Sequence, residues 1–418
     1  MMLRAHEKRI VIVGAALGLV VGALTVVAPS GLAVVSSCQV RDLTSGSAVS
    51  ADLQGVIHAA TSGDTVQVSG LCVGGFTIGK DLTIVGRSTS AVPQATLDGN
   101  REARVLRLIG GRTTDVVLWD VAITHGRAFS GPGVGSEKGN GGGIYIRQGS
   151  KVTLNGSTSV YGNTAELAGG GIYTYGINSA VTLNDSSSVT GNRTVISTGG
   201  GIYNSAGTVS LNNSSTVSRN RADAHGGGID NSRGGTAALN GSSSVTDNTA
   251  DEAGGIFNTG DLTLNGSSSV TGNTANFAGG IINEGQLTLV GSTSVAGNTA
   301  VGSAGGISNS GGSTVTLNDS SSVSGNSAGI RGGGIYNHYK RSSTVTLNDL
   351  ASVSGNSARR GGGIYNFGTT VTLNGSSSIT ANNATSSGGG IYNDREGTVT
   401  LNDSASLAGN IPDDCVGC

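Results

Sequence analysis

The sequence predicts an all-β fold, a right-handed parallel β-helix (solenoid) of about 13 coils of three short strands, with a short N-terminal capping helix. Three observations support this prediction. A unit of about 27 residues recurs along most of the chain, its apolar residues alternate with hydroxyl residues, and 73 glycines stand against 12% charged residues. This composition is unusual for a chain of ordinary compact domains.

The tripeptide Gly-Gly-Ile marks the repeat and occurs ten times. Nine intervals separate the first isoleucine from the last and span 247 residues, which gives a mean period of about 27. This period is too short for a propeller blade and fits one coil of a solenoid. The isoleucines are Ile144, Ile172, Ile202, Ile229, Ile256, Ile281, Ile307, Ile335, Ile364 and Ile391.

Each unit contains three segments that we expect to be β-strands, as at residues 199–204, 209–212 and 215–217. In the Val-Thr-Leu segments the apolar residues alternate with a hydroxyl, which is typical of a strand with one buried face. Gly, Asn-Gly and Asn-Asp steps separate the segments and tolerate the left-handed backbone that corners need. Three strands and three corners therefore close one coil.

One such coil is too small to bury its own apolar face, so it must stack on the next with parallel strands about 4.8 Å apart. Ten coils stacked in this way would extend for about 48 Å. Identical residues then lie above one another, and the core should contain the isoleucines, the Val/Leu pairs and a file of third-strand valines. These valines are Val160, Val189, Val217, Val245, Val270, Val295, Val323 and Val353.

Asparagines form two further files at the corners, and we expect both to be inward ladders. A stacked amide can bond to its neighbour and to the turn backbone, which makes its burial tolerable. Glycan attachment is the rival interpretation, because many of these residues begin an Asn-x-Ser/Thr sequence. The first file is Asn204, Asn231, Asn258, Asn283, Asn309, Asn337, Asn366 and Asn393, and the second is Asn163, Asn192, Asn220, Asn248, Asn273, Asn298, Asn326, Asn356, Asn382 and Asn410.

The chain divides into five predicted segments. Residues 1–33 are a signal peptide or an N-terminal anchor, residues 34–64 a cap with a short helix, and residues 65–140 irregular leading coils with a loop. Regular repeats fill residues 141–410, and residues 411–418 are a CxxC tail. Within the cap, residues 50–60 predict an amphipathic helix with Ser50 as its N-cap and Leu53, Val56 and Ile57 on one face.

The N-terminal segment has the pattern of an export signal. Arg4, Lys8 and Arg9 precede an unbroken apolar run at residues 10–27, and Gly31 and Ala33 suit cleavage after Ala33. An uncleaved membrane anchor and lipidation at Cys38 are the alternatives. Without residues 1–33 the chain is mildly acidic, with 21 Lys and Arg against 25 Asp and Glu, so nucleic acid is not an expected partner.

Four cysteines in an exported chain favour disulfides over metal ligands. Cys38 and Cys72 flank the N-terminal region, and Cys415 and Cys418 form a CxxC at the C-terminus. We expect the pairs Cys38–Cys72 and Cys415–Cys418. A redox role for the CxxC is the minor alternative, because no βαβ pattern surrounds it.

The repeats resemble right-handed β-helix repeat proteins, and more narrowly the repeats of polymorphic outer membrane proteins. Those units pair an FxxN element with a GGAI element, and here Val270-Thr-Gly-Asn273 precedes Gly279-Gly-Ile281, with valine in place of phenylalanine. The head, at residues 53–65 and 80–84, is similar to the start of exported pectin-lyase-like proteins. The resemblance covers about two thirds of the chain and implies a fold that also carries enzymes acting on uronic-acid polymers.

Neither catalytic pattern of those enzymes is evident in the sequence. Polysaccharide lyases need a Ca²⁺ cluster of carboxylates with a basic residue, and hydrolases need paired carboxylates. Asp98 is the acidic residue most like a site, but without an acidic neighbour we interpret it as a turn residue. We therefore predict no catalytic residue, no metal ligand and no cofactor. Asp185, Asp319, Asp349 and Asp403 stand where other coils have glycine, which favours a role in turn geometry.

Two outward files and one basic cluster are the candidate binding surfaces. Stacked tyrosines can hold sugar rings, and the predicted binding residues are Tyr173, Tyr203, Tyr336, Tyr365 and Tyr392. A Thr/Ser file with one hydroxyl residue per coil resembles the rows of ice-binding solenoids only weakly. The basic cluster is Lys340, Arg341, Arg359 and Arg360.

The expected function is that of an exported, non-enzymatic rod for adhesion, carbohydrate binding or structural support, located outside the cell or on its surface. The alternative is a lyase or hydrolase acting on polysaccharide, with its site in the irregular leading coils. Glycans or cell-surface ligands are the expected partners, and contact with a membrane is expected only through an uncleaved N-terminal segment. The chain is expected to be a monomer.

Overall fold

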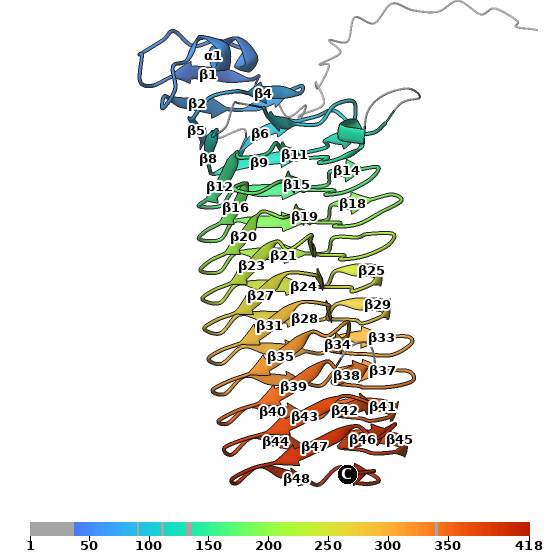
Figure 1. Cartoon of the computed structure of the whole chain (residues 1–418). Helices are drawn as coiled ribbons and strands as arrows, with labels where there is room; N and C mark the ends of the chain where they lie inside the picture. Colours follow the sequence, from blue (N-terminus) through green and yellow to red (C-terminus); the bar gives the residue numbers. More distant parts are fainter. Residues whose placement is uncertain (1–36, 90–91, 110–112, 131–135, 339–341) are drawn as a thin grey trace, which may run out of the picture. The chain divides into compact units, whose positions relative to one another are not determined.

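The computed structural model describes residues 37–89, 92–109, 113–130, 136–338 and 342–418. The chain divides into two units, Met1–Val34 and Val35–Cys418. The predicted signal peptide lies outside the described residues. The second unit is an all-β parallel solenoid of about 12 turns, close to the predicted number (Figure 1). The right-handed sense of its coils stays a prediction.

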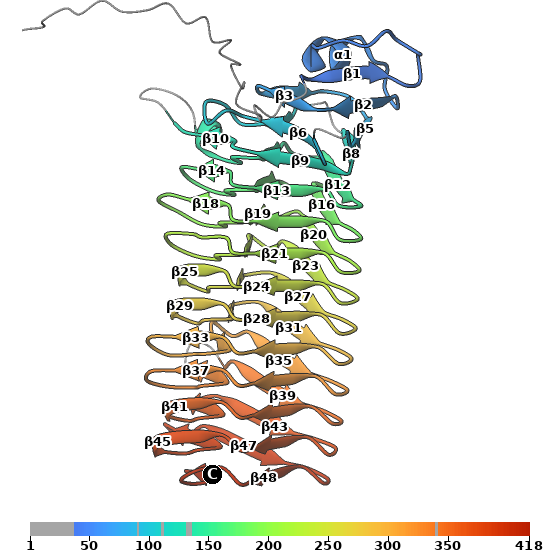
Figure 2. The ribbon, with the colours of Figure 1, turned by 180° about the vertical axis from the view of Figure 1, so that it is seen from behind.

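A regular coil passes through four strands in a fixed order. The first three are the predicted Ile-Tyr-Asn, Val-Thr-Leu and Ser-Val-Thr strands, and each kind stacks into its own sheet. The fourth is a short strand, often beginning with Thr-Ala, that the sequence did not predict. These Thr-Ala strands form two separate sheets of three and six strands, visible along one side in Figure 2.

The Ile-Tyr-Asn sheet contains 13 strands. It consists of β4 (Phe76–Ile78), β7 (Leu106–Leu108), β11 (Ile144–Ile146), β15 (Ile172–Tyr175), β19 (Ile202–Ser205), β22 (Ile229–Ser232), β26 (Ile256–Asn258), β30 (Ile281–Asn283), β34 (Ile307–Asn309), β38 (Ile335–His338), β42 (Ile364–Phe367), β46 (Ile391–Asp394) and β49 (Cys415–Val416).

The Val-Thr-Leu sheet contains 14 strands, and its first strand, β1, runs antiparallel to β2. It consists of β1 (Gln39–Asp42), β2 (Thr65–Ser69), β5 (Leu82–Arg87), β8 (Asp115–Trp119), β12 (Lys151–Asn155), β16 (Ala180–Leu183), β20 (Thr208–Leu211), β23 (Thr236–Leu239), β27 (Asp261–Leu264), β31 (Gln286–Leu289), β35 (Thr314–Leu317), β39 (Thr344–Leu347), β43 (Thr370–Leu373) and β47 (Thr398–Leu401).

The Ser-Val-Thr sheet contains 13 strands. It consists of β3 (Leu71–Val73), β6 (Ala95–Asp98), β9 (Val121–Thr124), β13 (Ser159–Tyr161), β17 (Ser188–Thr190), β21 (Thr216–Ser218), β24 (Ser244–Thr246), β28 (Ser269–Thr271), β32 (Ser294–Ala296), β36 (Ser322–Ser324), β40 (Ser352–Ser354), β44 (Ser378–Thr380) and β48 (Ser406–Ala408).

The Thr-Ala strands fall into an early group and a late group. The early group is β10 (Arg127–Ala128), β14 (Thr164–Ala165) and β18 (Arg193–Thr194), and the late group is β25 (Thr249–Glu252), β29 (Thr274–Phe277), β33 (Thr299–Ala300), β37 (Ser327–Ala328), β41 (Ser357–Arg360) and β45 (Asn383–Ser387).

Like residues stack on like residues along the whole repeat. Ile281 pairs with Ile307 in the Ile-Tyr-Asn sheet, and Val270 pairs with Val295 in the Ser-Val-Thr sheet. The repeat isoleucines and the predicted valine file are fully buried in one continuous apolar core. Each coil therefore obtains its interior from its two neighbours, as expected for a chain whose single coil encloses too little volume.

Both predicted asparagine files lie inside the solenoid and form hydrogen-bonded ladders. In the first file, Asn258 Nδ2 donates to Asn283 Oδ1 at 2.8 Å and to the carbonyl oxygen of Gly260 at 3.0 Å. In the second file, Asn273 Nδ2 donates to Asn298 Oδ1 at 3.0 Å and to the carbonyl oxygen of Val245 at 3.0 Å. Each amide thus joins neighbouring coils and also satisfies a backbone carbonyl oxygen.

A third ladder, absent from the sequence prediction, follows the Val-Thr-Leu strands. Asn184 Nδ2 donates to Asn155 Oδ1 at 2.7 Å, toward the N-terminus, whereas the other two ladders donate toward the C-terminus. Val290 interrupts the third ladder between Asn265 and Asn318. Its members are Asn155, Asn184, Asn212, Asn240, Asn265, Asn318, Asn348, Asn374 and Asn402.

The corner aspartates connect successive coils. The carboxylate of Asp185 accepts the backbone N–H of Gly156 at 2.9 Å, and that of Asp319 accepts the backbone N–H of Gly291 at 2.8 Å. Asp185, Asp319, Asp349 and Asp403 all adopt φ near +56°, the left-handed backbone that glycine has in other coils. A role in turn geometry explains these residues.

The predicted helix is α1 (Leu53–Ala59), and α1 is the only α-helix among the described residues. Leu53 and Ile57 are buried in the main core, and Val56 packs against it. The predicted N-cap was wrong: Asp52 caps the helix by accepting the backbone N–H of Gly55 at 2.9 Å. Ser50 instead accepts the backbone N–H of Asp52 at 3.0 Å.

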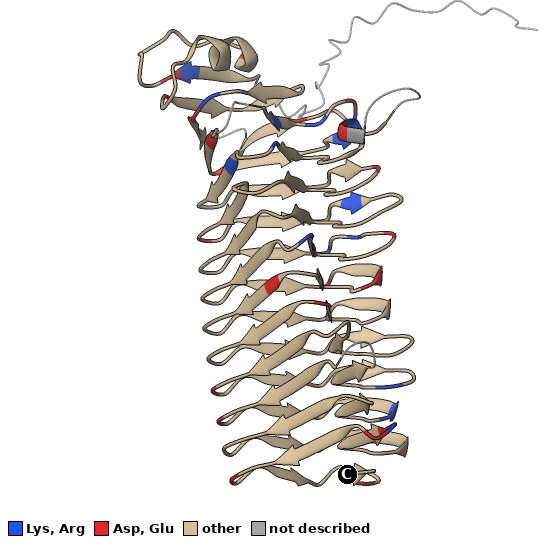
Figure 3. Cartoon of the chain, in the orientation of Figure 1, with Lys and Arg blue, Asp and Glu red and all other residues tan. Residues whose placement is uncertain are grey.

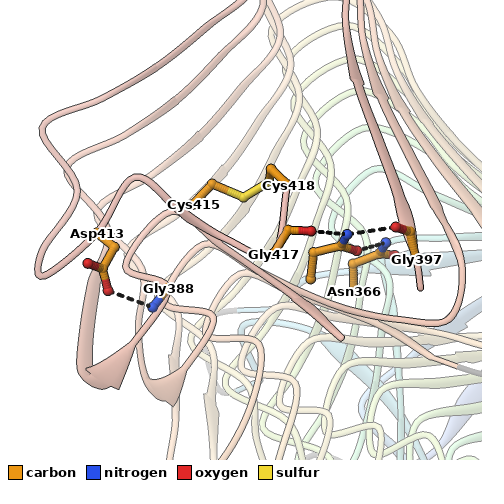
Figure 4. The surroundings of a disulfide bond; sticks show 8 residues. Asn366, Gly388, Gly397, Asp413, Cys415, Gly417 and Cys418 are labelled. Atoms are coloured by element: carbon orange, nitrogen blue, oxygen red, sulfur yellow. Dashed lines mark hydrogen bonds between the residues drawn. A yellow bond between two sulfur atoms is a disulfide. The ribbon is translucent and has the colours of Figure 1, made fainter. Parts of the chain in front are cut away.

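The four cysteines lie as two disulfide-bonded pairs, Cys38 with Cys72 and Cys415 with Cys418. The second pair belongs to the tail, whose strand β49 continues the Ile-Tyr-Asn sheet. Figure 4 shows two hydrogen bonds that hold this tail: the carbonyl oxygen of Gly417 accepts from Asn393 Nδ2 at 2.8 Å, and Asp413 accepts from the backbone N–H of Gly388.

Within the described part of the chain, no helix combines the length and apolar character needed to cross a membrane.

Candidate functional site

A cleft of about 760 Å³ opens beside the leading coils, a volume typical of ligand sites. The turn between β6 and β7 supplies one wall and β7 contributes Arg107. Strand β10 and the short 3-10 helix η1 (Ser136–Gly139) supply the rest. The lining residues are Arg101, Glu102, Ala103, Arg104, Arg107, Arg127, Ala128, Phe129, Glu137 and Lys138.

The cleft is strongly basic. Its lining contains five cationic and two acidic side chains, although the full chain has a net charge of −2. Figure 3 shows basic segments gathered around η1 and β10. Such a local concentration of one charge attracts ligands of the opposite charge.

Arg104 fixes one wall of the cleft. Its guanidinium donates to the carbonyl oxygens of Gly141 at 2.8 Å and Glu137 at 2.8 Å, and it lies 4.7 Å from the ring centre of Tyr145. Burial, with repulsion from Arg107, lowers the pKa of Arg104 to about 10, so the group stays charged at neutral pH. Arg104 thus holds η1 against the coils and still contributes a positive charge.

Three other cations of the cleft lack an acidic partner among the described residues. Arg127 stacks on Phe129 at 4.3 Å, and the Phe129 ring is 38% exposed. Arg107 forms an exposed ion pair with Glu137 at 3.4 Å, but no described carboxylate lies within 4.0 Å of Arg101, Arg127 or Lys138. These three side chains are free to meet a negatively charged ligand.

A histidine and an aspartate meet next to the turn that supplies one wall of the cleft. His125 Nδ1 lies 2.9 Å from Asp98 Oδ2, and these residues meet because β6 pairs with β9. Asp98 also accepts the backbone N–H of Asn100 at 2.7 Å, as expected for a turn residue. The carbonyl oxygen of His125 accepts the backbone N–H of Arg101 at 2.7 Å, which connects the pair to the cleft wall.

The tyrosine file faces outward from its sheet, but other side chains largely cover it. Tyr336 and Tyr365 are buried, while Tyr173, Tyr203 and Tyr392 are half-buried. Tyr173 and Tyr203 stack with ring centres 5.2 Å apart, and Tyr365 and Tyr392 stack at 5.1 Å. Burial raises the pKa of Tyr173, Tyr203 and Tyr365.

The side chains that cover the late tyrosines come from the Thr-Ala strands and from the residues that follow them. Arg331 lies 5.3 Å from the ring centre of Tyr365, and Arg360 lies 5.6 Å from that of Tyr392. Phe277 meets Tyr336 edge to face at 6.4 Å. These segments therefore add a second, smaller apolar cluster outside the main core, and we assign Tyr336, Tyr365 and Tyr392, which belong to this cluster, a packing role in it.

The predicted basic cluster is only partly described. Lys340 and Arg341 lie outside the described residues. Arg331, which was not part of the predicted cluster, lies with Arg359 and Arg360 around a depression of about 90 Å³. This depression is much smaller than the cleft beside the leading coils.

Asp230 stands in place of a tyrosine in the middle of the tyrosine file. Its pKa provides a test of how tightly this position is buried. The side chain is 2% exposed, and burial raises its pKa from 3.8 to about 6 although Ser232 and Thr198 donate hydrogen bonds to it. A raised folded-state pKa contributes stability that is complete below pH 3.8 and is lost as the pH rises through about 6.

We therefore expect Asp230→Asn to be more stable than the wild type by about 3 kcal/mol at pH 8, and equally stable near pH 3.5. Urea unfolding at the two pH values measures the difference. An equal gain in the free energy of unfolding at both pH values would contradict a raised pKa for Asp230.

The cleft was not predicted from the sequence. Its residues come from three separate segments, 101–107, 127–129 and 137–138, in a region without the repeat, so no register related them. One signal was available: Arg101, Arg104 and Arg107 recur every third residue within a mostly uncharged chain.

No family model, curated protein or solved structure matches this chain. The function must therefore be argued from the cleft itself.

Proposed function

We propose that this chain is an exported, non-enzymatic β-solenoid that binds an acidic glycan in the basic cleft beside its leading coils. The observation that carries the proposal is the set of three cations, Arg101, Arg127 and Lys138, that surround a cleft of ligand size without acidic partners among the described residues. Export is supported by the predicted leader at residues 1–33. A relation to pectin-lyase-like and polymorphic outer membrane repeats belongs to the same proposal.

The chemistry of the lining favours an acidic saccharide over a simple anion. Guanidinium groups bind carboxylate and sulfate through two parallel hydrogen bonds. Ala103, Ala128 and the exposed ring of Phe129 supply apolar surface beside those groups, and the C–H face of a sugar ring packs well on such surface. A uronic-acid unit has both a carboxylate for the guanidinium groups and a sugar ring for the apolar surface.

The test is calorimetric titration of the full chain with short oligogalacturonates. We expect Arg101→Gln and Arg127→Gln each to weaken binding about tenfold or more, because a hydrogen bond to a charged group contributes about 1.5–3 kcal/mol. Added salt should weaken binding further. Arg219→Gln is the matched control, since this exposed arginine lies outside the cleft.

Two results would overturn the proposal: equal binding of oligomers whose carboxyl groups have been reduced, or an equal loss of binding in the Arg219→Gln control.

An enzyme acting on acidic polysaccharide is the second candidate, and the contact between His125 and Asp98 favours it. A carboxylate that accepts from Nδ1 leaves Nε2 as a potential base. The oligomers recovered from the titrations decide between the candidates. Shortened products that disappear with His125→Gln would establish the enzyme, and unchanged oligomers would remove it.

A further inference from the structure

The outward face of the late Val-Thr-Leu sheet carries a regular array of threonines. Each of the last four strands, β35, β39, β43 and β47, has the sequence Thr-Val-Thr-Leu, with the valine directed inward. The register places the threonines in two parallel columns without a break. The first column is Thr314, Thr344, Thr370 and Thr398, and the second is Thr316, Thr346, Thr372 and Thr400.

This array corrects the expectation of one hydroxyl residue per coil on this strand. The strand begins earlier than the Val-Leu alternation alone indicated, so Thr314 and its equivalents also face outward. In earlier coils the first column is interrupted, for example by Lys151, Asp261 and Gln286. Only the late coils therefore present two complete columns.

The geometry of the array is fixed by the backbone. Neighbouring coils are about 4.8 Å apart, and two columns separated by two residues along a strand are about 6.6 Å apart. Threonine is branched at Cβ and has few side-chain rotamers, so little freedom remains to be lost on binding. The result is a grid that repeats in two directions.

Most of the hydroxyl groups in the grid are unused within the protein. Thr314 Oγ1 donates to Gln286 Oε1 at the edge of the array. The other seven hydroxyls form no hydrogen bond with another described residue. They are partly or fully exposed, and every position of the grid is uncharged. The surface therefore offers a neutral ligand repeated hydrogen bonds, with methyl groups between them.

We propose that this eight-threonine array binds the surface of ice. An ice surface is neutral and periodic in two directions, and these two properties correspond to those of the grid. Water hydrogen-bonded to the hydroxyls and ordered around the methyl groups joins the crystal without displacement of a counter-ion. The array lies on a different sheet from the basic cleft, so the inference is independent of glycan binding.

The test is partition of the full chain into a slowly growing ice crystal, together with inhibition of ice recrystallisation. We expect the wild type to enter the ice, and Thr346→Lys and Thr372→Lys to lose at least tenfold in the ice-bound fraction. Thr380→Lys is the matched control, because Thr380 faces outward on β44 of the same coil as β43 but on the Ser-Val-Thr sheet. Circular dichroism verifies that each variant is folded.

Thr372→Val provides a variant that keeps the shape and the methyl groups, and it should retain most of the ice binding if the variant is folded. The proposal is overturned if the wild type is excluded from ice like an ordinary soluble protein, or if Thr380→Lys loses as much binding as Thr346→Lys. A sugar-binding role for the same face would appear as exclusion from ice together with calorimetric binding of neutral oligosaccharides.

Discussion

Gly280→Ala is expected to destabilise the solenoid by about 3 kcal/mol or more, the range in which overpacked interiors fail. A methyl group at this position would lie 2.5 Å from the carbonyl oxygen of Gly306 and 3.0 Å from Asn298 Nδ2. Both atoms belong to the next coil, and the ladder holds Asn298 in place. The two coils would have to move apart, with loss of the contacts on which each depends.

Gly79→Ala is the matched control for this substitution. A methyl group there meets no atom within 4 Å, and Gly79 does not have a positive φ. We expect its effect to lie within about 0.5 kcal/mol of zero. Urea unfolding followed by circular dichroism measures both variants, and similar losses in the two would show that the close approach of the coils is not the cause.

Asn298→Ala is expected to cost about 4 kcal/mol, because it removes a central member of a buried ladder. Asn298 Nδ2 donates to the carbonyl oxygen of Val270 at 3.0 Å and to Asn326 Oδ1 at 2.9 Å. Its Oδ1 accepts from both the backbone N–H and Nδ2 of Asn273, at 2.9 and 3.0 Å. Alanine removes all four of these buried hydrogen bonds.

The control for the ladder is Asn402→Ala at the end of the third ladder. This exposed side chain makes one hydrogen bond to the ladder, to Asn374 Oδ1 at 2.7 Å. Its loss should cost less than about 1 kcal/mol. Thermal unfolding compares the two variants, and an Asn298→Ala protein as stable as Asn402→Ala would mean that the buried ladder contributes little.

The repeat made most of the fold predictable. Once Gly-Gly-Ile defined the period, stacking fixed which residues share a file, and the buried positions of Ile281, Val270 and Asn273 were determined by it. The third ladder escaped the prediction because Asn184 also reads as an ordinary turn residue before Asp185. The helix was recognised from Leu53 and Ile57, whereas its cap depended on the local backbone at Asp52.

The cleft and the cover over the tyrosines depend on parts of the chain that do not repeat. Arg101 and Arg127 approach the same space because β6 pairs with β9, and the hydrophobic pattern of those strands does not specify the path of the turns after them. The tyrosines alternate correctly to the outside of their strand. Arg331 and Phe277 cover Tyr365 and Tyr336 because they lie next to or within the Thr-Ala strands, and these short strands lack an alternating pattern long enough to recognise.

The in-register stacking has a consequence for how such a chain can change over generations. The strand register pairs each residue with its equivalent one period away, so the contact between any two coils closely resembles the contact between the next two. Duplication or deletion of one period in the gene would therefore lengthen or shorten the protein by about 4.8 Å while the junctions on either side reform. The length of such a solenoid can therefore change in evolution by whole coils.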